Sequence, residues 1–387
     1  QRIAGIENAI KVRRNQLKAL HNDSMVAMNE KEEQQLRAAV AADPELQAAF
    51  GDAWSLIDGA IDTYRNFYEE HLFIENAAAF NSELFNHART IVRGTAEREL
   101  PNSDRIRAYT DAALPQVEQG LSAQRPINKE YEQLRLTFSL EKMREWLGPD
   151  SNHVHDILGN ESPEGLAAAL VDGSKLDDPE VRMALWDGGV EAVTSSEDPM
   201  IRLALEIDPA ARVLRERFEN KVEAPLTRGE EMVADARFRI YGSETYPDAT
   251  FTLRVTYGAV KGWEEKGELV DPITRTSRLF ERATGSRPFM LPDTWQAARE
   301  DLDPDTPFNF VATTDITGGN SGSPIVAADG NLVGLAFDGN IHSIAGDYWF
   351  DPATNRTVGV DTAIMLEALE KVYKANHIVA EITGDTP

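Results

Sequence analysis

Cysteine is absent from this chain of 387 residues. Its absence excludes disulfides, a thiol nucleophile and thiolate metal sites, but an oxidising compartment stays open, because it permits disulfides without requiring them. Positive charge is also scarce: 39 Lys and Arg residues stand against 65 Asp and Glu residues, so the net charge is −26. Such a surface repels phosphate backbones and anionic lipids, so we expect neither nucleic acid nor a membrane as a partner.

Long hydrophobic runs are missing as well. No uninterrupted apolar stretch approaches the roughly 18 residues that indicate a transmembrane helix, so we expect no membrane span. The hydrophobic fraction of 42% is nevertheless enough for a packed core. At about 150 residues per domain, the length predicts two domains.

The sequence changes character near residue 235. Before it, segments such as 30–42, 44–70 and 129–146 are rich in Ala, Leu, Glu, Gln and Arg, which lose little side-chain freedom in a helix. We therefore predict a mostly α-helical domain over residues 1–235. Residue 1 is Gln and the first forty residues already have helical composition, so we expect this domain to be incomplete at its N-terminus.

After residue 235 the pattern favours strands. Apolar and polar residues alternate over 250–257, which predicts a strand. The segments 325–326 and 332–337 flank Ala-Asp-Gly-Asn at 328–331, which predicts a hairpin. A further short strand is expected over 357–360.

The second domain, residues 236–387, is therefore predicted as strands followed by a helix. Its length fits a six-stranded antiparallel barrel over 236–361 and a closing helix within 362–375, with Asp361 as the N-cap. The fold class expected for the whole chain is α+β: a helical domain, then an antiparallel β-barrel, then a C-terminal helix.

The most specific motif is Gly-Gly-Asn-Ser-Gly-Ser-Pro at 318–324. Three glycines allow a tight turn that exposes the Ser321 hydroxyl and turns backbone N–H groups into one concavity. The N–H groups of Gly319 and Ser321 would form an oxyanion hole for a tetrahedral intermediate. Since Pro324 leads into a strand, the motif fits the nucleophile loop of a chymotrypsin-type barrel and not the strand-to-helix elbow of α/β-hydrolases.

Several segments around this motif resemble one protein family. The segments 309–324, 332–340 and 346–351, with 246–254 before them, are similar to the bacterial serine dipeptidyl aminopeptidases of the dipeptidyl peptidase 7 and 11 type. The similarity runs from about residue 120 to the end. It implies a chymotrypsin-like double barrel whose inserted helical domain caps the cleft and restricts cleavage to dipeptides at a free N-terminus. It also implies oligopeptide substrates and a homodimer, and we expect no metal or other cofactor.

The chain departs from that family in its histidines. A chymotrypsin-type triad runs His, Asp, Ser, and its first two members come from a barrel that precedes the helical domain. None of the seven histidines lies in such a segment. His153 and His155 are predicted to be structural or solvated, and His342 a loop residue at the rim. We therefore expect a C-terminal fragment without the catalytic His and Asp, from a periplasmic or secreted protein whose signal peptide lies upstream.

Two further site residues follow from the resemblance. It implies that Asp338 binds the free α-ammonium of the peptide. A strand-end Asp that caps a turn with Gly339 and Asn340 is the alternative. Gly339 stands where acid-preferring members of the family carry Arg. A preference for hydrophobic residues at the penultimate substrate position is therefore predicted.

Two other functions stay open. Asp315 lies six residues before Ser321, which is the offset of the acid that selects Lys or Arg in trypsin-like endopeptidases. A non-catalytic helical interaction protein with a relic barrel is the other alternative. A helical region of some 235 residues favours the exopeptidase over a trypsin-like endopeptidase. The intact serine motif favours it over a non-catalytic protein.

Overall fold

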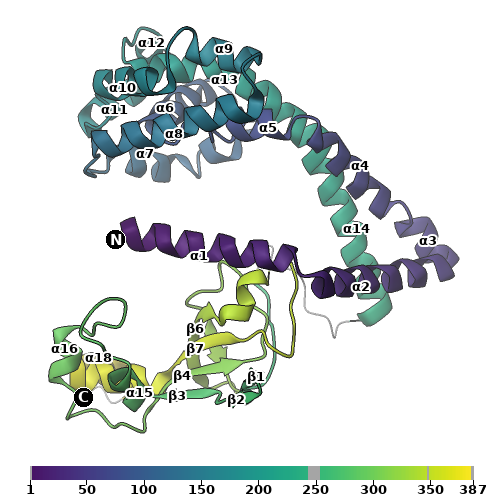
Figure 1. Ribbon diagram of the computed structural model, residues 1–387, viewed down its shortest axis with the longest axis vertical. Coiled ribbons are helices and arrows are strands. Elements are labelled where there is room, and N and C mark those ends of the chain that lie inside the picture. The colour runs from purple at the N-terminus through teal and green to yellow at the C-terminus, as the bar shows by residue number, and fades with distance from the viewer. Residues whose placement is uncertain (1, 243–252, 347, 385–387) are drawn as a thin grey trace. The chain divides into compact units, whose positions relative to one another are not determined.

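The computed structural model describes residues 2–242, 253–346 and 348–384 (Figure 1). The chain divides into a helical unit, Ala48–Asp235, and a sheet-bearing unit, Gln1–Gln47 with Ala236–Pro387. The expected helical domain over 1–235 therefore differs from the structure in its first 47 residues. These join the second unit because α1 (Arg2–Leu20) packs on the short helix η6 (Ile341–Ala345) and Asn29 donates a hydrogen bond to the carbonyl of Tyr348 at 3.0 Å.

The helical unit is built from short and medium helices around one core. Those after α3 (Pro44–Phe50) are α4 (Ala53–Arg65), α5 (Tyr68–Glu70), η1 (His71–Glu75), α6 (Glu83–Arg98), η2 (Asn102–Asp104), η3 (Arg107–Tyr109), α7 (Leu114–Ser122), α8 (Lys129–Leu147), α9 (Asn152–Leu158), α10 (Pro163–Gly173), α11 (Pro179–Asp187), α12 (Gly189–Thr194), α13 (Pro199–Phe218), η4 (Glu219–Glu223) and α14 (Ala224–Tyr241). The predicted helix over 129–146 is confirmed. The segment 44–70 is helical in three pieces, because turns at 51–52 and 66–67 interrupt it.

Close packing holds α6 against its neighbours. Its N-cap, Ser82, accepts hydrogen bonds from the N–H groups of Leu84 and Phe85. Gly94, in the middle of the helix, lets the ring of Trp186 approach the backbone, since a Cβ there would overlap that ring. Trp186 is fully buried.

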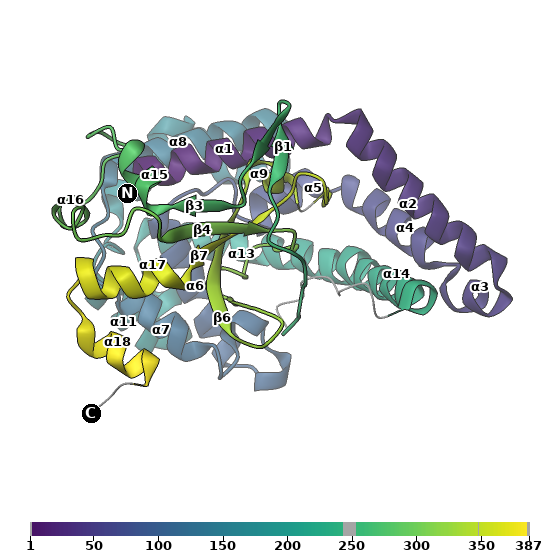
Figure 2. The ribbon, with the colours of Figure 1, turned by 90° about the horizontal axis from the view of Figure 1, so that it is seen from below.

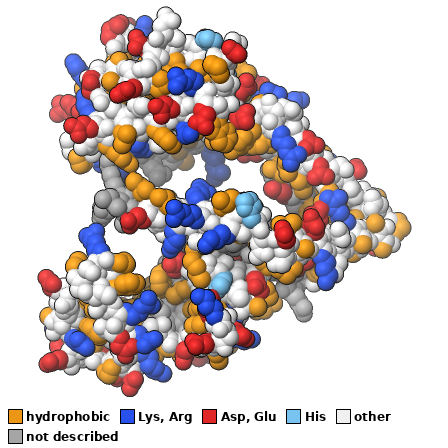
Figure 3. Space-filling view, in the orientation of Figure 1, with side chains coloured by type: hydrophobic (Ala, Val, Ile, Leu, Met, Phe, Trp, Pro, Cys, Tyr) orange, Lys and Arg blue, Asp and Glu red, His pale blue; other side chains and the backbone are white. Residues whose placement is uncertain are grey.

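On the face of the helical unit in Figure 3, acidic, basic and apolar side chains are interspersed, as on an ordinary solvated surface.

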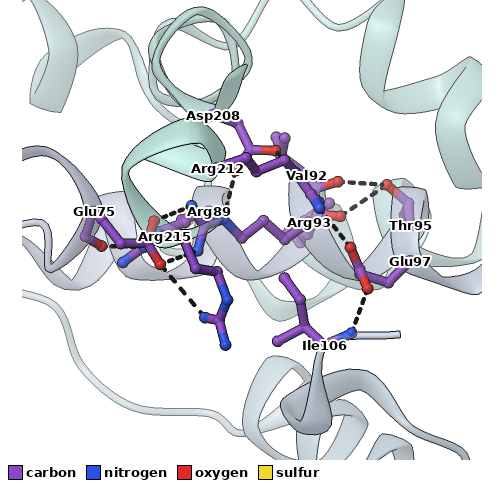
Figure 4. Close-up of polar contacts among 11 residues, drawn as sticks. Glu75, Arg89, Val92, Arg93, Thr95, Glu97, Ile106, Asp208, Arg212 and Arg215 are labelled. Atoms are coloured by element: carbon purple, nitrogen blue, oxygen red, sulfur yellow. Dashed lines mark hydrogen bonds and ion pairs between the residues drawn. The ribbon is translucent and has the colours of Figure 1, made fainter. Parts of the chain in front are cut away.

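A buried ion-pair network joins η1, α6 and α13 (Figure 4). Arg93, with a side chain only 5% exposed, binds both Glu75 and Asp208. Asp208 also binds Arg212, whose Nη1 donates to Glu97 Oε1 at 2.6 Å. Burial lowers the pKa of Arg93, but the hydrogen bonds to Glu75 and Asp208 outweigh it and the net shift is upward. The network thus ties α13 to η1 and α6, which lie far earlier in the chain, and Glu75 also pairs with Arg89 and Arg215.

The sheet-bearing unit adds strands and short helices to the two N-terminal helices. Its elements after α1 are α2 (Asp23–Ala42), β1 (Trp263–Glu265), β2 (Glu268–Val270), β3 (Ile273–Arg275), α15 (Thr276–Glu281), α16 (Asp293–Ala297), β4 (Pro307–Ala312), β5 (Pro324–Val326), β6 (Leu332–Gly339), η6, β7 (Thr357–Asp361), α17 (Thr362–Glu367), η7 (Ala368–Val372) and α18 (Asn376–Thr383). None of the helices among the described residues is both long and apolar enough to cross a membrane.

The strands form an open sheet, so the predicted closed six-stranded barrel is wrong for the described residues. Five strands pair antiparallel in the order β3-β4-β7-β6-β5, and β1-β2 is a separate hairpin. Figure 2 shows β3, β4 and β7 side by side. Residues 250–252 of the strand expected at 250–257 lie outside the described residues, and 253–257 are not paired into a strand. The mixed α+β class is confirmed.

The local predictions in this unit agree with the structure. β5 and β6 form the expected hairpin, and β7 and α17 follow as expected. Asp361 caps α17 by accepting the N–H of Ala363 at 2.8 Å. The ring of Phe310 fills the sheet core above two strands that carry glycine, since a Cβ at Gly334 or Gly359 would lie 2.6 or 2.9 Å from it.

The ion-pair network should contribute measurably to stability. Arg93→Met should lower the free energy of unfolding by about 3 kcal/mol, because it leaves Glu75 and Asp208 buried with fewer cations. Arg202→Met, at an exposed position on α13, is the matched control. Urea unfolding followed by circular dichroism measures both, and equal midpoints for the two variants would contradict a stabilising network.

Candidate active site

The glycine-rich motif lies in the loop that joins β4 to β5. These strands are not neighbours, since β7 and β6 lie between them in the sheet, so the loop crosses the ends of both. At its start, the hydroxyl of Thr357 on β7 donates to the carbonyl of Thr314 at 2.7 Å. At its end, Gly322 N–H donates to the carbonyl of Ala336 at 2.7 Å, and Ala336 N–H donates to the carbonyl of Ser323 at 3.0 Å. The loop is therefore fixed to the sheet on both sides of Ser321.

The turn within the loop has the conformation that glycine allows. Gly319 has φ +102° and Gly322 has φ +86°, both in the left-handed region. The N–H of Asn320 donates to the carbonyl of Thr317 at 3.2 Å, and the Asn320 side chain accepts the N–H of Thr317 at 3.0 Å. These contacts close the turn that presents Ser321.

The turn leaves some backbone donors available. Gly319 and Ser321 are both exposed, and their N–H groups, like that of Gly318, form no hydrogen bond with any residue that the structure describes. The N–H groups of Asn320 and Gly322 are both used. An approaching oxygen atom would therefore find unpaired donors at the two positions predicted for an oxyanion hole.

The Ser321 hydroxyl has no hydrogen-bond partner within the described part of the chain. His342 does not contact it. Instead, His342 Nε2 lies 2.6 Å from Glu265 Oε2, which also accepts the indole N–H of Trp263 at 3.1 Å. The hydrogen bond from His342, followed by that from Trp263, lowers the pKa of Glu265. His342 thus has a partner of its own and ties η6 to β1.

Two histidines that were considered above belong to the helical unit, and their side chains form no hydrogen bond or ion pair with a described residue. His153 and His155 lie in α9. No group of three potential metal ligands occurs among the residues that the structure describes.

Asp338 lies at the end of β6, beyond a bulge that falls between Ala336 and Asp338. Its carboxylate is exposed, and Oδ1 accepts the N–H of Gly339 at 2.9 Å. This local bond is the one that the turn-capping interpretation expects. The second oxygen, Oδ2, has no partner among the residues described, so the carboxylate keeps an acceptor for another donor.

Gly339 has a packing role that sequence patterns did not reveal. A Cβ at this position would lie 2.7 Å from the Cβ of Ser343 in η6. Ser343 cannot easily move, because its hydroxyl donates to Asn340 Oδ1 at 2.9 Å and accepts the N–H of Arg356 at 3.1 Å. Position 339 therefore has to be glycine, because Ser343 leaves no room for a Cβ there.

Arg356 is a residue that sequence analysis missed entirely. It is 2% exposed, and burial lowers its pKa. Its guanidinium donates only to backbone carbonyls, namely those of Lys261, Gly262, Pro352, Ala353 and Asn355. Asn340, which is also buried, donates to the carbonyl of Thr354 at 2.7 Å. Together these residues hold the end of β6 and the chain that follows it. A single buried Arg in a loop is a weak sequence signal, because its partners are carbonyls of any residue type.

Known proteins are similar to this chain over most of its length. The family model Peptidase S46 matches residues 1–384. The Asp/Glu-specific dipeptidyl-peptidase of Shewanella putrefaciens is 26% identical over 357 residues, which are 82% of this chain and 47% of that protein. Dipeptidyl-peptidase 7 of Phocaeicola vulgatus is 37% identical over 147 residues, which are 35% of this chain and 20% of that protein.

A solved structure is similar in fold. It is the crystal structure of Porphyromonas endodontalis DPP11 in complex with the dipeptide Arg-Glu, with a TM-score of 0.73 and 21% identity. The match covers 98% of this chain and 56% of that one. The chain thus spans about half the length of the Shewanella and Porphyromonas proteins.

Proposed function

Because the chain belongs to the peptidase S46 family, we propose that its protein is a serine exopeptidase that releases dipeptides from the free N-termini of oligopeptides. The relatives that carry the name dipeptidyl-peptidase support the reaction. The observation that carries the assignment of Ser321 is the loop geometry: an exposed serine, fixed to the sheet on both sides, beside backbone N–H groups that the fold leaves unpaired.

The proposed chemistry uses these groups in turn. The Ser321 hydroxyl attacks the scissile carbonyl, the N–H groups of Gly319 and Ser321 stabilise the oxyanion, and water resolves the acyl-enzyme. A serine hydroxyl needs a general base to become a good nucleophile. Since no described histidine contacts Ser321, the base must be sought outside the contacts of this loop. A periplasmic or secreted location and a homodimer also stay predictions.

Replacement of the nucleophile tests the assignment directly. In the full-length protein, Ser321→Ala should lower kcat for dipeptide release by at least roughly 10³-fold, because it removes the attacking oxygen. Ser323→Ala, two residues away in the same loop, is the matched control and should retain activity. Similar losses in both variants would instead indicate damage to the loop, and unchanged activity in Ser321→Ala would refute the proposal.

Asp338 is proposed to bind the substrate's α-ammonium. Its Oδ2 is available, and a carboxylate that is desolvated by substrate pairs strongly with a cation and penalises a blocked N-terminus.

Blocked substrates and one isosteric variant test this role. Asp338→Asn should lower kcat/KM by about 10²- to 10³-fold for free N-termini. The same variant should leave the low rate on N-acetylated peptides unchanged. Glu268→Gln, exposed on β2, is the control. Equal cleavage of free and acetylated peptides by the native protein would contradict the role and favour an endopeptidase.

Gly339 is proposed to set the preference for hydrophobic penultimate residues, because it offers no charge to an acidic side chain. The structure shows that Arg cannot simply be introduced here, since Ser343 occupies the space of a Cβ.

A double variant separates packing from specificity. Gly339→Arg alone should lower stability by about 1–3 kcal/mol through overpacking, and the loss should be smaller in a Ser343→Gly background. The double variant, compared with Ser343→Gly alone, should shift cleavage toward penultimate Asp and Glu. Thermal unfolding and a panel of dipeptidyl substrates measure the two effects. A native preference for acidic residues would overturn the specificity proposal while leaving Ser321 in place.

A further inference from the structure

The helical unit contains a cavity of about 660 Å³ that the proposed catalytic residues do not share. We refer to it as the α6–α7 cavity. One wall is a single face of α6, since Glu83, Asn86, His87 and Thr90 follow helical spacing. The facing wall comes from α7, with Val117 and its neighbours. Figure 1 shows α6, α7 and α11 in the same part of the helical unit, and α11 contacts both of the others.

A buried positive charge lies against this cavity. Arg182, from α11, is 1% exposed, and its three guanidinium nitrogens donate to the carbonyls of Leu121, Leu176 and Ala123, each at 2.7 Å. No carboxylate among the described residues forms an ion pair with it. Carbonyl groups satisfy its hydrogen bonds but do not cancel its charge, and burial lowers its pKa. The cavity therefore faces a buried cation that is hydrogen-bonded to carbonyl groups alone, although the charges of Asp178 and Asp177 act on it from a longer range.

Arg125, which also lines the cavity, adds a second cation. It is exposed, and it makes no hydrogen bond or ion pair with the residues that the structure describes. The carboxylate of Glu83 also lines the cavity, so the formal charge of the lining arginines and this glutamate is 2 − 1 = +1 when His87 is neutral. A local excess of positive charge is notable in a chain with a net charge of −26.

His87 also lines the cavity, and the charges of both arginines act on it. Neither ring nitrogen hydrogen-bonds to a described residue. Burial, followed by the charges of Arg182 and Arg125, lowers its pKa to about 4. The imidazole is therefore neutral near pH 7, with a ring N–H that could donate to an acceptor in the cavity.

We propose that the α6–α7 cavity is a binding site for a small organic monocarboxylate with an apolar body. The carboxylate would pair with Arg125 and accept the N–H of His87, which supplies a charge-assisted and a neutral hydrogen bond. The apolar body would lie on Ala113, Val117, Gly120 and Leu121. A volume of about 660 Å³ is in the range of small-molecule sites, roughly 300–1,000 Å³.

The test uses nuclear magnetic resonance of ¹³C-labelled histidine in the full-length protein, with the His87 signal assigned by its loss in His87→Gln. Titration with 4-methylpentanoate should shift that signal saturably and raise the pKa of His87, because a bound carboxylate favours the imidazolium. The uncharged 4-methylpentanamide should bind at least about tenfold more weakly. Inorganic phosphate, which lacks the apolar body, should also bind more weakly.

Two variants test whether the carboxylate binds in the α6–α7 cavity. Arg125→Met should weaken 4-methylpentanoate on the order of tenfold, whereas Arg202→Met, exposed on α13 and absent from the cavity lining, should not. The proposal is overturned if the His87 signal does not saturate, if the amide binds as tightly as the acid, if phosphate binds best, or if Arg125→Met has no effect. Because the signal is independent of turnover, the result does not depend on the peptidase assignment.

Discussion

Two main-chain hydrogen bonds hold the candidate site together. Gly322 N–H to Ala336 O and Ala336 N–H to Ser323 O extend the pairing of β5 with β6 into the loop that carries Ser321. Strand β6 continues from Ala336 to Asp338, two residues further along the chain. The hydrogen bonds between β5 and β6 therefore fix the proposed nucleophile in position relative to the proposed ammonium-binding carboxylate. Backbone pairing fixes such a distance more firmly than contacts between exposed side chains would.

Side chains packed near the β5–β6 pair restrict which residues the backbone can carry there. Phe310 needs glycine at positions 334 and 359, and Ser343 needs glycine at 339. Arg356 holds the chain after β6 through carbonyl groups alone. The glycines near the site thus serve two purposes. Gly319 and Gly322 supply a left-handed turn, while the others make room for a neighbour.

Predictions from the sequence succeeded where the signal was local. The helix over 129–146, the hairpin around 328–331 and the Asp361 cap each depend on a few adjacent residues. The prediction of a closed barrel was wrong because closure depends on pairing between distant strands. The placement of residues 1–47 with the sheet-bearing unit was not foreseen for the same reason, since it depends on contacts between distant parts of the chain. Within the site, the motif predicted an exposed Ser321. The contact of Gly339 with Ser343 and the pairing of His342 with Glu265 could not be predicted, because each joins residues whose proximity only the fold determines.

The central claim is that Ser321 is the nucleophile, and covalent labelling tests it most directly. The full-length protein would be treated with a fluorophosphonate, which reacts with activated serine hydroxyls, and the modified residue would be located by peptide mass spectrometry. The account predicts one adduct per chain, on Ser321, that forms in step with the loss of dipeptide release. An adduct on another serine that accompanies the same loss, or full loss of activity with Ser321 unmodified, would contradict it.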